Sequence, residues 1–116
     1  MFININDNQF KVDIARTPEE KSKGMMNQKF NSKFNGLLFL MDGDEHCFWM
    51  KNCIIKLDII FIRNMEIVNI FHNCEPCVSD ECEHFCDYGD LVLELKGGTC
   101  EKLNINVGDK IELKVL

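Results

Sequence analysis

Four of the chain's seven cysteines lie within thirteen residues, where metal or disulfide chemistry is expected. Cys74, Cys77, Cys82 and Cys86 have the spacing Cys-x2-Cys-x4-Cys-x3-Cys, which is one residue short of a zinc knuckle in its last gap. A Zn²⁺ ion takes four thiolate or imidazole ligands in a tetrahedron, and His84 could replace one thiolate. Four protein ligands leave no position for water or substrate, so the spacing predicts a structural zinc ion.

The same four cysteines could instead form disulfides or remain free thiols. Four cysteines allow three disulfide pairings, and sequence alone does not distinguish among them. A reducing compartment favours metal binding or free thiols over disulfides. Because seven is an odd number, full internal pairing cannot occur in a monomer. The cysteine state therefore has three open alternatives.

Two carboxylates, Asp58 and Glu94, each interrupt an otherwise apolar segment. A buried carboxylate needs a partner or a raised pKa. One expectation is that Lys51 pairs with one of them in a shallow pocket; another is that both are solvated acids on the wet face of an antiparallel sheet. If the two lay within roughly 5–10 Å in an open cleft, they could act as general acid and base in glycoside hydrolysis.

The segment Phe48–Asn52 combines an aromatic residue with polar neighbours. Trp49 could form an aromatic wall, while Lys51 and Asn52 could hold a carboxylate or sugar hydroxyls. The alternative is an ordinary core strand in which Trp49 only packs. We expect a recognition surface here.

Short β-strands must position these residues. Alternating apolar residues predict an opening hairpin over residues 2–14, and Thr17-Pro-Glu-Glu20 predicts a capped helix that ends near Gly24. Thr99 is expected to cap a single helical turn. Further strands are predicted over residues 37–41, 46–50, 57–62, 66–71, 91–95 and 111–115. The pattern predicts a mostly β (α+β) chain: a small barrel-like or sandwich-like sheet with one short N-terminal helix, in a single domain spanning residues 1–116.

Composition narrows the class of protein. The 116 residues are 46% hydrophobic and carry a net charge of −6, so they are expected to form one modest core and to repel nucleic acid. No apolar run approaches the ~20 residues of a membrane span. The N-terminus lacks the features of a signal peptide, so a cytoplasmic location is expected, with export open only to a trimmed form of a longer chain. The oligomeric state is left open.

Several segments together resemble the DUF192 (UPF0127) family of small uncharacterised bacterial and archaeal proteins. They occur in this order: Thr17–Glu20, Lys23–Met26, Gly36–Phe39, Phe48–Asn52, Leu57–Phe61, Leu93–Leu95 and Gly98–Asp109. The resemblance implies a compact, mostly β domain with a short helix near its start, but no activity. Many relatives have threonine at the position of Cys53.

The resemblance also bears on the cysteines. Relatives usually carry two cysteines in a Pro-Cys…Cys arrangement, and Cys77 and Cys82 fall on those positions. The resemblance thus favours Cys77–Cys82 as the disulfide alternative. Cys74 and Cys86 are extra relative to the family pattern, and they could form an outer bridge.

The combined hypothesis is a non-catalytic binding or accessory module for a small molecule or a protein. Its proposed surface consists of Trp49, Lys51, Asn52, Asp58 and Glu94, beside a cysteine-stapled loop. The first alternative is a hydrolase that uses Asp58 and Glu94. The second is a metal-handling or redox protein built on the Cys74–Cys86 cluster.

Overall fold

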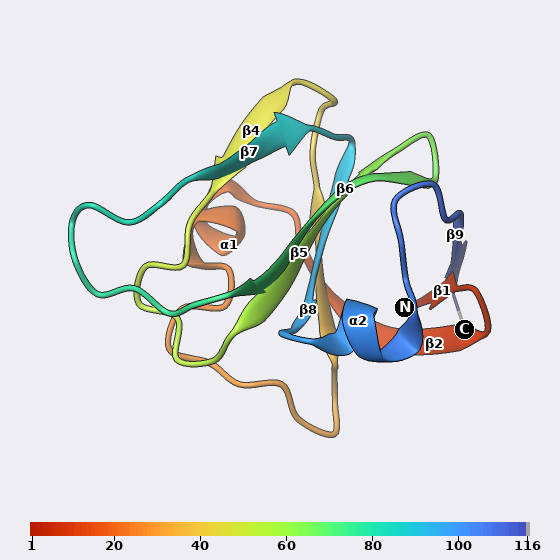
Figure 1. Cartoon of the computed structure of the whole chain (residues 1–116), viewed down its shortest axis with the longest axis horizontal. Helices are drawn as coiled ribbons and strands as arrows, with labels where there is room; N and C mark the ends of the chain where they lie inside the picture. The colour runs from red at the N-terminus through yellow and green to blue at the C-terminus, as the bar shows by residue number, and fades with distance from the viewer. Residues whose placement is uncertain (116) are drawn as a thin grey trace.

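A curled sheet of seven strands forms the body of the protein, in the order β6-β5-β8-β3-β2-β1-β9 (Figure 1). The computed structural model describes residues 1–115. The elements are β1 (Phe2–Ile5), β2 (Asn8–Ala15), α1 (Pro18–Lys23), β3 (Gly36–Leu40), β4 (Glu45–Phe48), β5 (Leu57–Arg63), β6 (Glu66–Cys74), β7 (Phe85–Tyr88), β8 (Leu91–Lys96), α2 (Thr99–Leu103) and β9 (Ile111–Lys114). All neighbouring strands are antiparallel except β2 and β3, which are parallel.

The curl brings the two outer strands of the sheet towards each other. An isolated bridge joins Glu66 at the start of β6 to Lys110 just before β9. Backbone hydrogen bonds from Ile67 N–H to Asp109 O (2.8 Å) and from Ile111 N–H to Met65 O (2.9 Å) extend this contact. The sheet is therefore a half-barrel, which confirms the predicted mostly β, barrel-like class.

The connection from β2 to β3 contains α1, because strands that run parallel need a crossover. Thr17 and Glu20 form the predicted capping box: Glu20 N–H donates to Thr17 Oγ1 at 3.1 Å, and Thr17 N–H donates to Glu20 Oε1 at 3.0 Å. The helix ends at Gly24, whose φ of 48° lies in the left-handed region.

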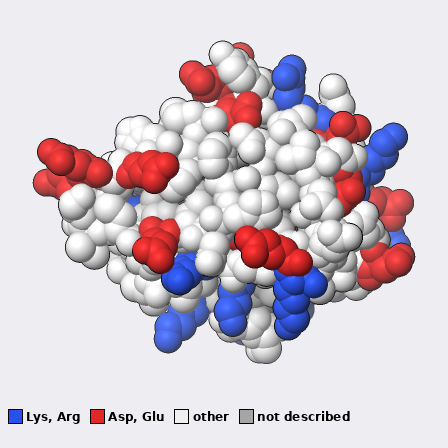
Figure 2. All heavy atoms as spheres, in the orientation of Figure 1, with Lys and Arg blue, Asp and Glu red and all other residues white. Residues whose placement is uncertain are grey.

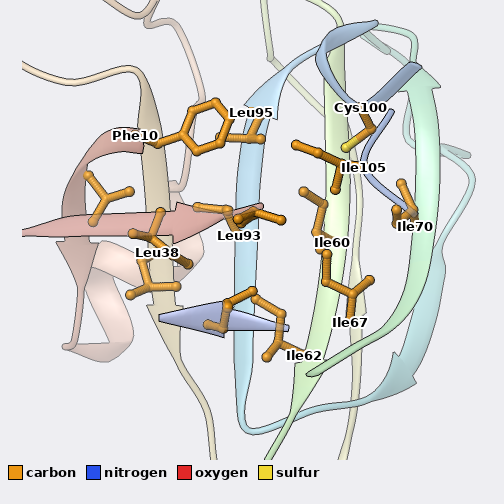
Figure 3. Packing of buried hydrophobic residues seen from close by; sticks show 14 residues of the cluster. Phe10, Leu38, Ile60, Ile62, Ile67, Ile70, Leu93, Leu95, Cys100 and Ile105 are labelled. Carbon is orange, nitrogen blue, oxygen red and sulfur yellow. The ribbon is translucent and has the colours of Figure 1, made fainter. Parts of the chain in front are cut away.

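Each face of the sheet carries its own apolar cluster. The face enclosed by the curl includes Ile60, Leu93 and Leu95, and it is covered by the segment that holds Cys100 and Ile105 (Figure 3). The opposite face includes Phe39, Ile59 and Phe61. Since side chains alternate along a strand, β8 sends Leu93 and Leu95 to the first face and Val92 and Glu94 to the second.

A separate two-stranded ribbon, β4 paired with β7, covers part of the second face (Figure 1). Cys47 of β4 lies opposite Cys86 of β7, and the two form a disulfide with Cα atoms 4.0 Å apart. A second disulfide joins Cys77 to Cys82 in the loop before β7. Strand β7 was not predicted, because its residues were assigned to the cysteine loop.

The start of α2 differs from the expectation. Gly98, not Thr99, is the N-cap residue, and the Thr99 hydroxyl donates to Lys96 O at 2.6 Å. The prediction of a Thr99 cap is wrong because a side chain from β5 occupies this position, as described below. None of the helices within residues 1–115 has the length and apolar character needed to cross a membrane.

Candidate functional site

A pocket of about 400 Å³ opens on the second face of the sheet, between α1, the end of β3, the ribbon strand β4 and strand β8. Its size falls within the range of small-molecule sites, about 300–1,000 Å³. Lys21 and Gly24 border it on the α1 side, Phe48 on the ribbon side, and Glu94 of β8 on the sheet side. The pocket is therefore built by segments that are far apart in the sequence.

Glu94 forms the floor of this pocket and is only 3% exposed. The register places it beside Ile59 of β5 and Leu37 of β3, so its side chain emerges from an apolar wall. No donor among residues 1–115 reaches its Oε1 atom. Burial raises the pKa of Glu94 to about 8. At pH 7 the free protein thus holds mainly a neutral carboxyl group here.

Aromatic rings and thioethers line the pocket together with Glu94. The rings of Phe39 and Phe48 meet edge to face with centroids 4.9 Å apart, and Phe48 meets Phe61 in the same manner at 5.7 Å. Met26 and Met41 are half-buried and also line the pocket. This edge-to-face packing fixes the ring positions, so the walls are largely preformed.

The rim of the pocket carries polar and cationic groups. Lys21 and Lys23 of α1 line it, together with His46, whose Nε2 lies 2.6 Å from Asp42 Oδ1. Trp49 is 39% exposed at the edge, with the Lys51 ammonium 5.4 Å from its ring centroid. The pocket thus has a buried acid at its floor and bases at its mouth.

Two cysteines contact the pocket, and neither offers a reactive thiolate. Cys53 is buried, and desolvation together with the nearby Glu94 raises the pKa of its thiol to about 12. Cys47 is bound to Cys86, and this disulfide fixes the ribbon that forms the outer wall. Their contribution to the site is structural.

Asp58 lies outside this pocket and has a structural role. It is fully buried, and three backbone N–H groups donate to its carboxylate: Asn73 at 2.7 Å, Gly98 at 3.1 Å and Cys100 at 2.9 Å. The carboxylate therefore caps α2 from a neighbouring strand and ties β6 to the same point.

The two acids cannot act together as the hydrolase alternative requires. The register pairs Asp58 with Leu95 and Ile59 with Glu94, so the two carboxylates project from opposite faces of the sheet. The expected pairing of an acid with Lys51 is also wrong, because Lys51 Nζ lies 2.6 Å from Asp80 Oδ1 in the cysteine loop. That aspartate side chain is 95% exposed, which makes the ion pair a weak one.

Lys51 and Asn52 lie in a turn that holds the cysteine loop. Asn52 has a φ of 60°, its N–H donates to Cys77 O at 2.8 Å, and its carbonyl accepts from Asn27 N–H at 2.8 Å. Cys77 N–H in turn donates to Met50 O at 3.1 Å. Of the five residues predicted for the binding surface, the structure brings Trp49 and Glu94 together at the pocket. The Lys51 ammonium lies over the Trp49 ring at the rim, and Asn52 and Asp58 lie elsewhere.

The predicted zinc site is not supported. Cys77 and Cys82 are bonded to each other, Cys86 is bonded to Cys47, and the Cys74 thiol is buried and donates to Phe71 O at 3.4 Å. Sulfur atoms engaged in disulfides are not available as thiolate ligands. Within residues 1–115, no group of three or more His, Cys, Asp or Glu side chains is arranged to hold a metal ion.

The disulfide pattern agrees with only half of the expectation. The Cys77–Cys82 bridge that the resemblance favoured is present. The outer Cys74–Cys86 bridge is wrong, because β7 pairs with β4 and brings Cys86 directly opposite Cys47. Cys74 ends β6 on the apolar side of the sheet and remains a free thiol.

Sequence reasoning missed most of the pocket wall. Met26, Phe39 and Cys53 were assigned no role in a site. A signal was available in the segment Lys23–Met26, which contributed to the family resemblance but contains no obviously reactive group. The structure shows that this segment borders the pocket.

Comparison with known proteins identifies the family of this chain. The model of DUF192, described as an uncharacterized conserved family, matches residues 1–113. The chain belongs to the DUF192 family. No curated protein matches it significantly.

Two solved structures are similar to this DUF192 chain. One is a protein of unknown function from Novosphingobium aromaticivorans DSM 12444, with 31% identity and a TM-score of 0.83 over 97% of this chain and 84% of that protein. The other, from Sinorhizobium meliloti 1021, is described as a candidate transcription regulator. It has 26% identity and a TM-score of 0.85 over 96% of this chain and 91% of that protein.

Proposed function

We propose that this DUF192 protein is a non-catalytic binding module for a small molecule, which enters the pocket beside Trp49 and reaches Glu94. The observation that carries the proposal is the Glu94 carboxyl, which belongs to a residue that lines the pocket and whose buried Oε1 atom has no donor within residues 1–115. Leaving such a group unsatisfied costs about 1–3 kcal/mol of stability. A ligand that supplies the donor would account for a residue that the fold alone does not need.

Binding without catalysis is favoured by the surroundings of Glu94. Asp58 lies on the other face of the sheet, and the Cys53 thiol is held protonated. Asp58 was the partner predicted for Glu94 in acid–base chemistry, and Cys53 is the free thiol that lines the pocket. The name of the Sinorhizobium relative does not change the proposal, because a net charge of −6 opposes contact with a nucleic-acid backbone.

The test is a fragment screen by two-dimensional NMR on ¹⁵N-labelled protein. Fragments that bind are expected to shift the amides of Glu94 and Phe48 and the indole N–H of Trp49. Met26→Trp should fill the pocket and remove these shifts, whereas Val107→Trp, at an exposed site away from the pocket, should leave them. A screen in which no fragment perturbs these signals in the wild type would overturn the proposal.

A further inference from the structure

The unsatisfied Glu94 oxygen also restricts the chemistry of the ligand. We infer, building on the proposed function, that the group meeting Glu94 is an ammonium, so that the ligand is a small organic amine with an apolar body, either a simple amine or an amino acid. Hydroxyl and amide groups could supply a donor to the neutral carboxyl, but only a cation also stabilises the ionised form of a carboxyl group removed from water.

The walls of the pocket suit a cation as well as an apolar body. Ring faces attract ammonium groups when the cation lies within about 6 Å of the centroid. Trp49 already makes this contact on the rim with Lys51 at 5.4 Å, and Phe39 and Phe48 lie deeper in the same pocket. No second anion on the pocket wall competes for the ammonium, because Glu94 is the one acidic residue among those that line the pocket within residues 1–115.

The charges on the rim of the pocket favour an amino acid over a simple amine. Lys21 and Lys23 line the mouth, and no acidic partner within residues 1–115 forms an ion pair with either of them. Their charges oppose the entry of a simple cation but attract a carboxylate. An amino acid with its ammonium group on Glu94 can direct its carboxylate towards these lysines, so we expect it to bind more tightly than the amine alone.

Binding of an ammonium releases a proton from Glu94, whereas binding of the other ligands does not. The free Glu94 carboxyl is protonated at pH 7 because burial raises its pKa to about 8. When the ammonium binds, the carboxyl becomes a carboxylate, the ion pair forms, and the released proton passes to the buffer. With this pKa, about 0.9 proton is released per ligand at pH 7.

The experiment is isothermal titration calorimetry at pH 7 in two buffers with different ionisation enthalpies. The probes are 2-phenylethylamine, phenylalanine, 2-phenylethanol and 3-phenylpropionate, which share a phenyl body and differ in their polar groups. We expect the two amines to bind with proton release and the other two to bind at least 10-fold more weakly without it. Affinity for 2-phenylethylamine should rise by nearly 10-fold per pH unit between pH 6 and 7 and level off above pH 8, since a primary amine resembling lysine stays protonated in this range.

Two variants assign the proton to Glu94. Glu94→Gln should remove both the proton release and the pH dependence and weaken amine binding at least 10-fold. His46→Gln should retain the proton release and the pH dependence between pH 6 and 8; it is the matched control because it replaces the imidazole that lines the same pocket and pairs with Asp42. The remaining rim and wall groups are the lysines and the Cys53 thiol, whose pKa of about 12 lies outside the window. Loss of the proton release in His46→Gln alone would overturn the inference.

The outcomes separate this inference from the proposed function. If 2-phenylethanol or 3-phenylpropionate binds as tightly as the amines, or if the amines bind without proton release, the inferred ammonium ligand is wrong. The pocket still binds ligands in that case, so the proposed function stands. If none of the probes binds a protein whose pocket accepts other fragments by NMR, the inference again fails alone. If no fragment binds either, both proposals fall.

Discussion

Asp58 and Glu94 lie on the neighbouring strands β5 and β8, and their carboxyl groups project from opposite faces of one sheet. The first receives three backbone hydrogen bonds and caps a helix, whereas the Oε1 atom of the second receives none from residues 1–115. Two acidic residues in similar apolar segments thus have different roles. Asp58 stabilises the fold on one face of the sheet, and Glu94 lines a pocket on the other. The predictions below separate the two roles.

Replacement of Asp58 by asparagine should destabilise the fold by about 2–4 kcal/mol, because hydrogen bonds to charged groups contribute about 1.5–3 kcal/mol and an amide cannot accept at both positions. Urea denaturation at pH 7 measures this change. Asp44→Asn, at an exposed turn residue, is the control and should change stability by less than about 0.5 kcal/mol. An equally small effect at Asp58 would contradict its capping role.

Replacement of Glu94 by leucine should stabilise the protein, and the gain should grow with pH. The pKa of Glu94 is about 8 in the folded state and near its ordinary value of 4.5 in the unfolded state. The folded wild type therefore holds an extra proton between these values, and its stability falls by up to about 1.4 kcal/mol per pH unit from pH 4.5 to 8. Below pH 4.5 this contribution is fully present; above pH 8 it is lost.

The Glu94→Leu prediction is checked by the difference between the two unfolding free energies, measured in urea at several pH values. Taking the difference cancels the titration of all other groups. A difference that stays flat from pH 5 to 8 would show that the Glu94 carboxyl is not held neutral in the folded protein.

Structural features that depend on contacts between residues close in sequence could be predicted from the sequence. Thr17, Glu20 and Gly24 determine α1 through contacts a few residues apart. Asn64 and Met65, with φ values of 51° and 63°, form the turn that separates the strands predicted over residues 57–62 and 66–71. These features follow from local chemistry, so they could be predicted.

Features set by long-range pairing could not be predicted in the same way. The partner of Cys86 depends on the pairing of β4 with β7, across 39 residues of sequence. The roles of Asp58 and Glu94 depend on strand register, because shifting one strand by a single residue would exchange the faces. The spacing of the four clustered cysteines predicted zinc because it contains no information about Cys47.

The two disulfides should differ in their contribution to stability. Cys47–Cys86 closes a sequence separation of 39 and Cys77–Cys82 one of 5, so the loop-entropy model gives about 4 and about 2 kcal/mol. Paired serine variants, Cys47→Ser with Cys86→Ser and Cys77→Ser with Cys82→Ser, are compared by urea denaturation under oxidising conditions. Both differences should vanish when all proteins are reduced. Equal effects, or the reverse order, would count against these connectivities.

Three thiols should remain titratable once the oxidised protein is unfolded, namely those of Cys53, Cys74 and Cys100. In the native state they should react slowly with a thiol reagent at pH 8, because burial raises the pKa of Cys53 and of Cys74 to about 12 and that of Cys100 further in the same direction. Thiol counts with and without denaturant measure this. Fast native labelling of Cys53 would show that the pocket floor opens to solvent.

The outer wall of the pocket belongs to the β4–β7 ribbon, whereas its floor belongs to the main sheet. Figure 2 shows charged side chains concentrated at the periphery of this view, with acidic ones at the end where the 75–83 loop projects (Figure 1), and most residues of this loop are exposed. A family built this way can diversify what it recognises by exchanging residues on a strand pair that lies outside the main sheet, without altering the strand pairing of that sheet.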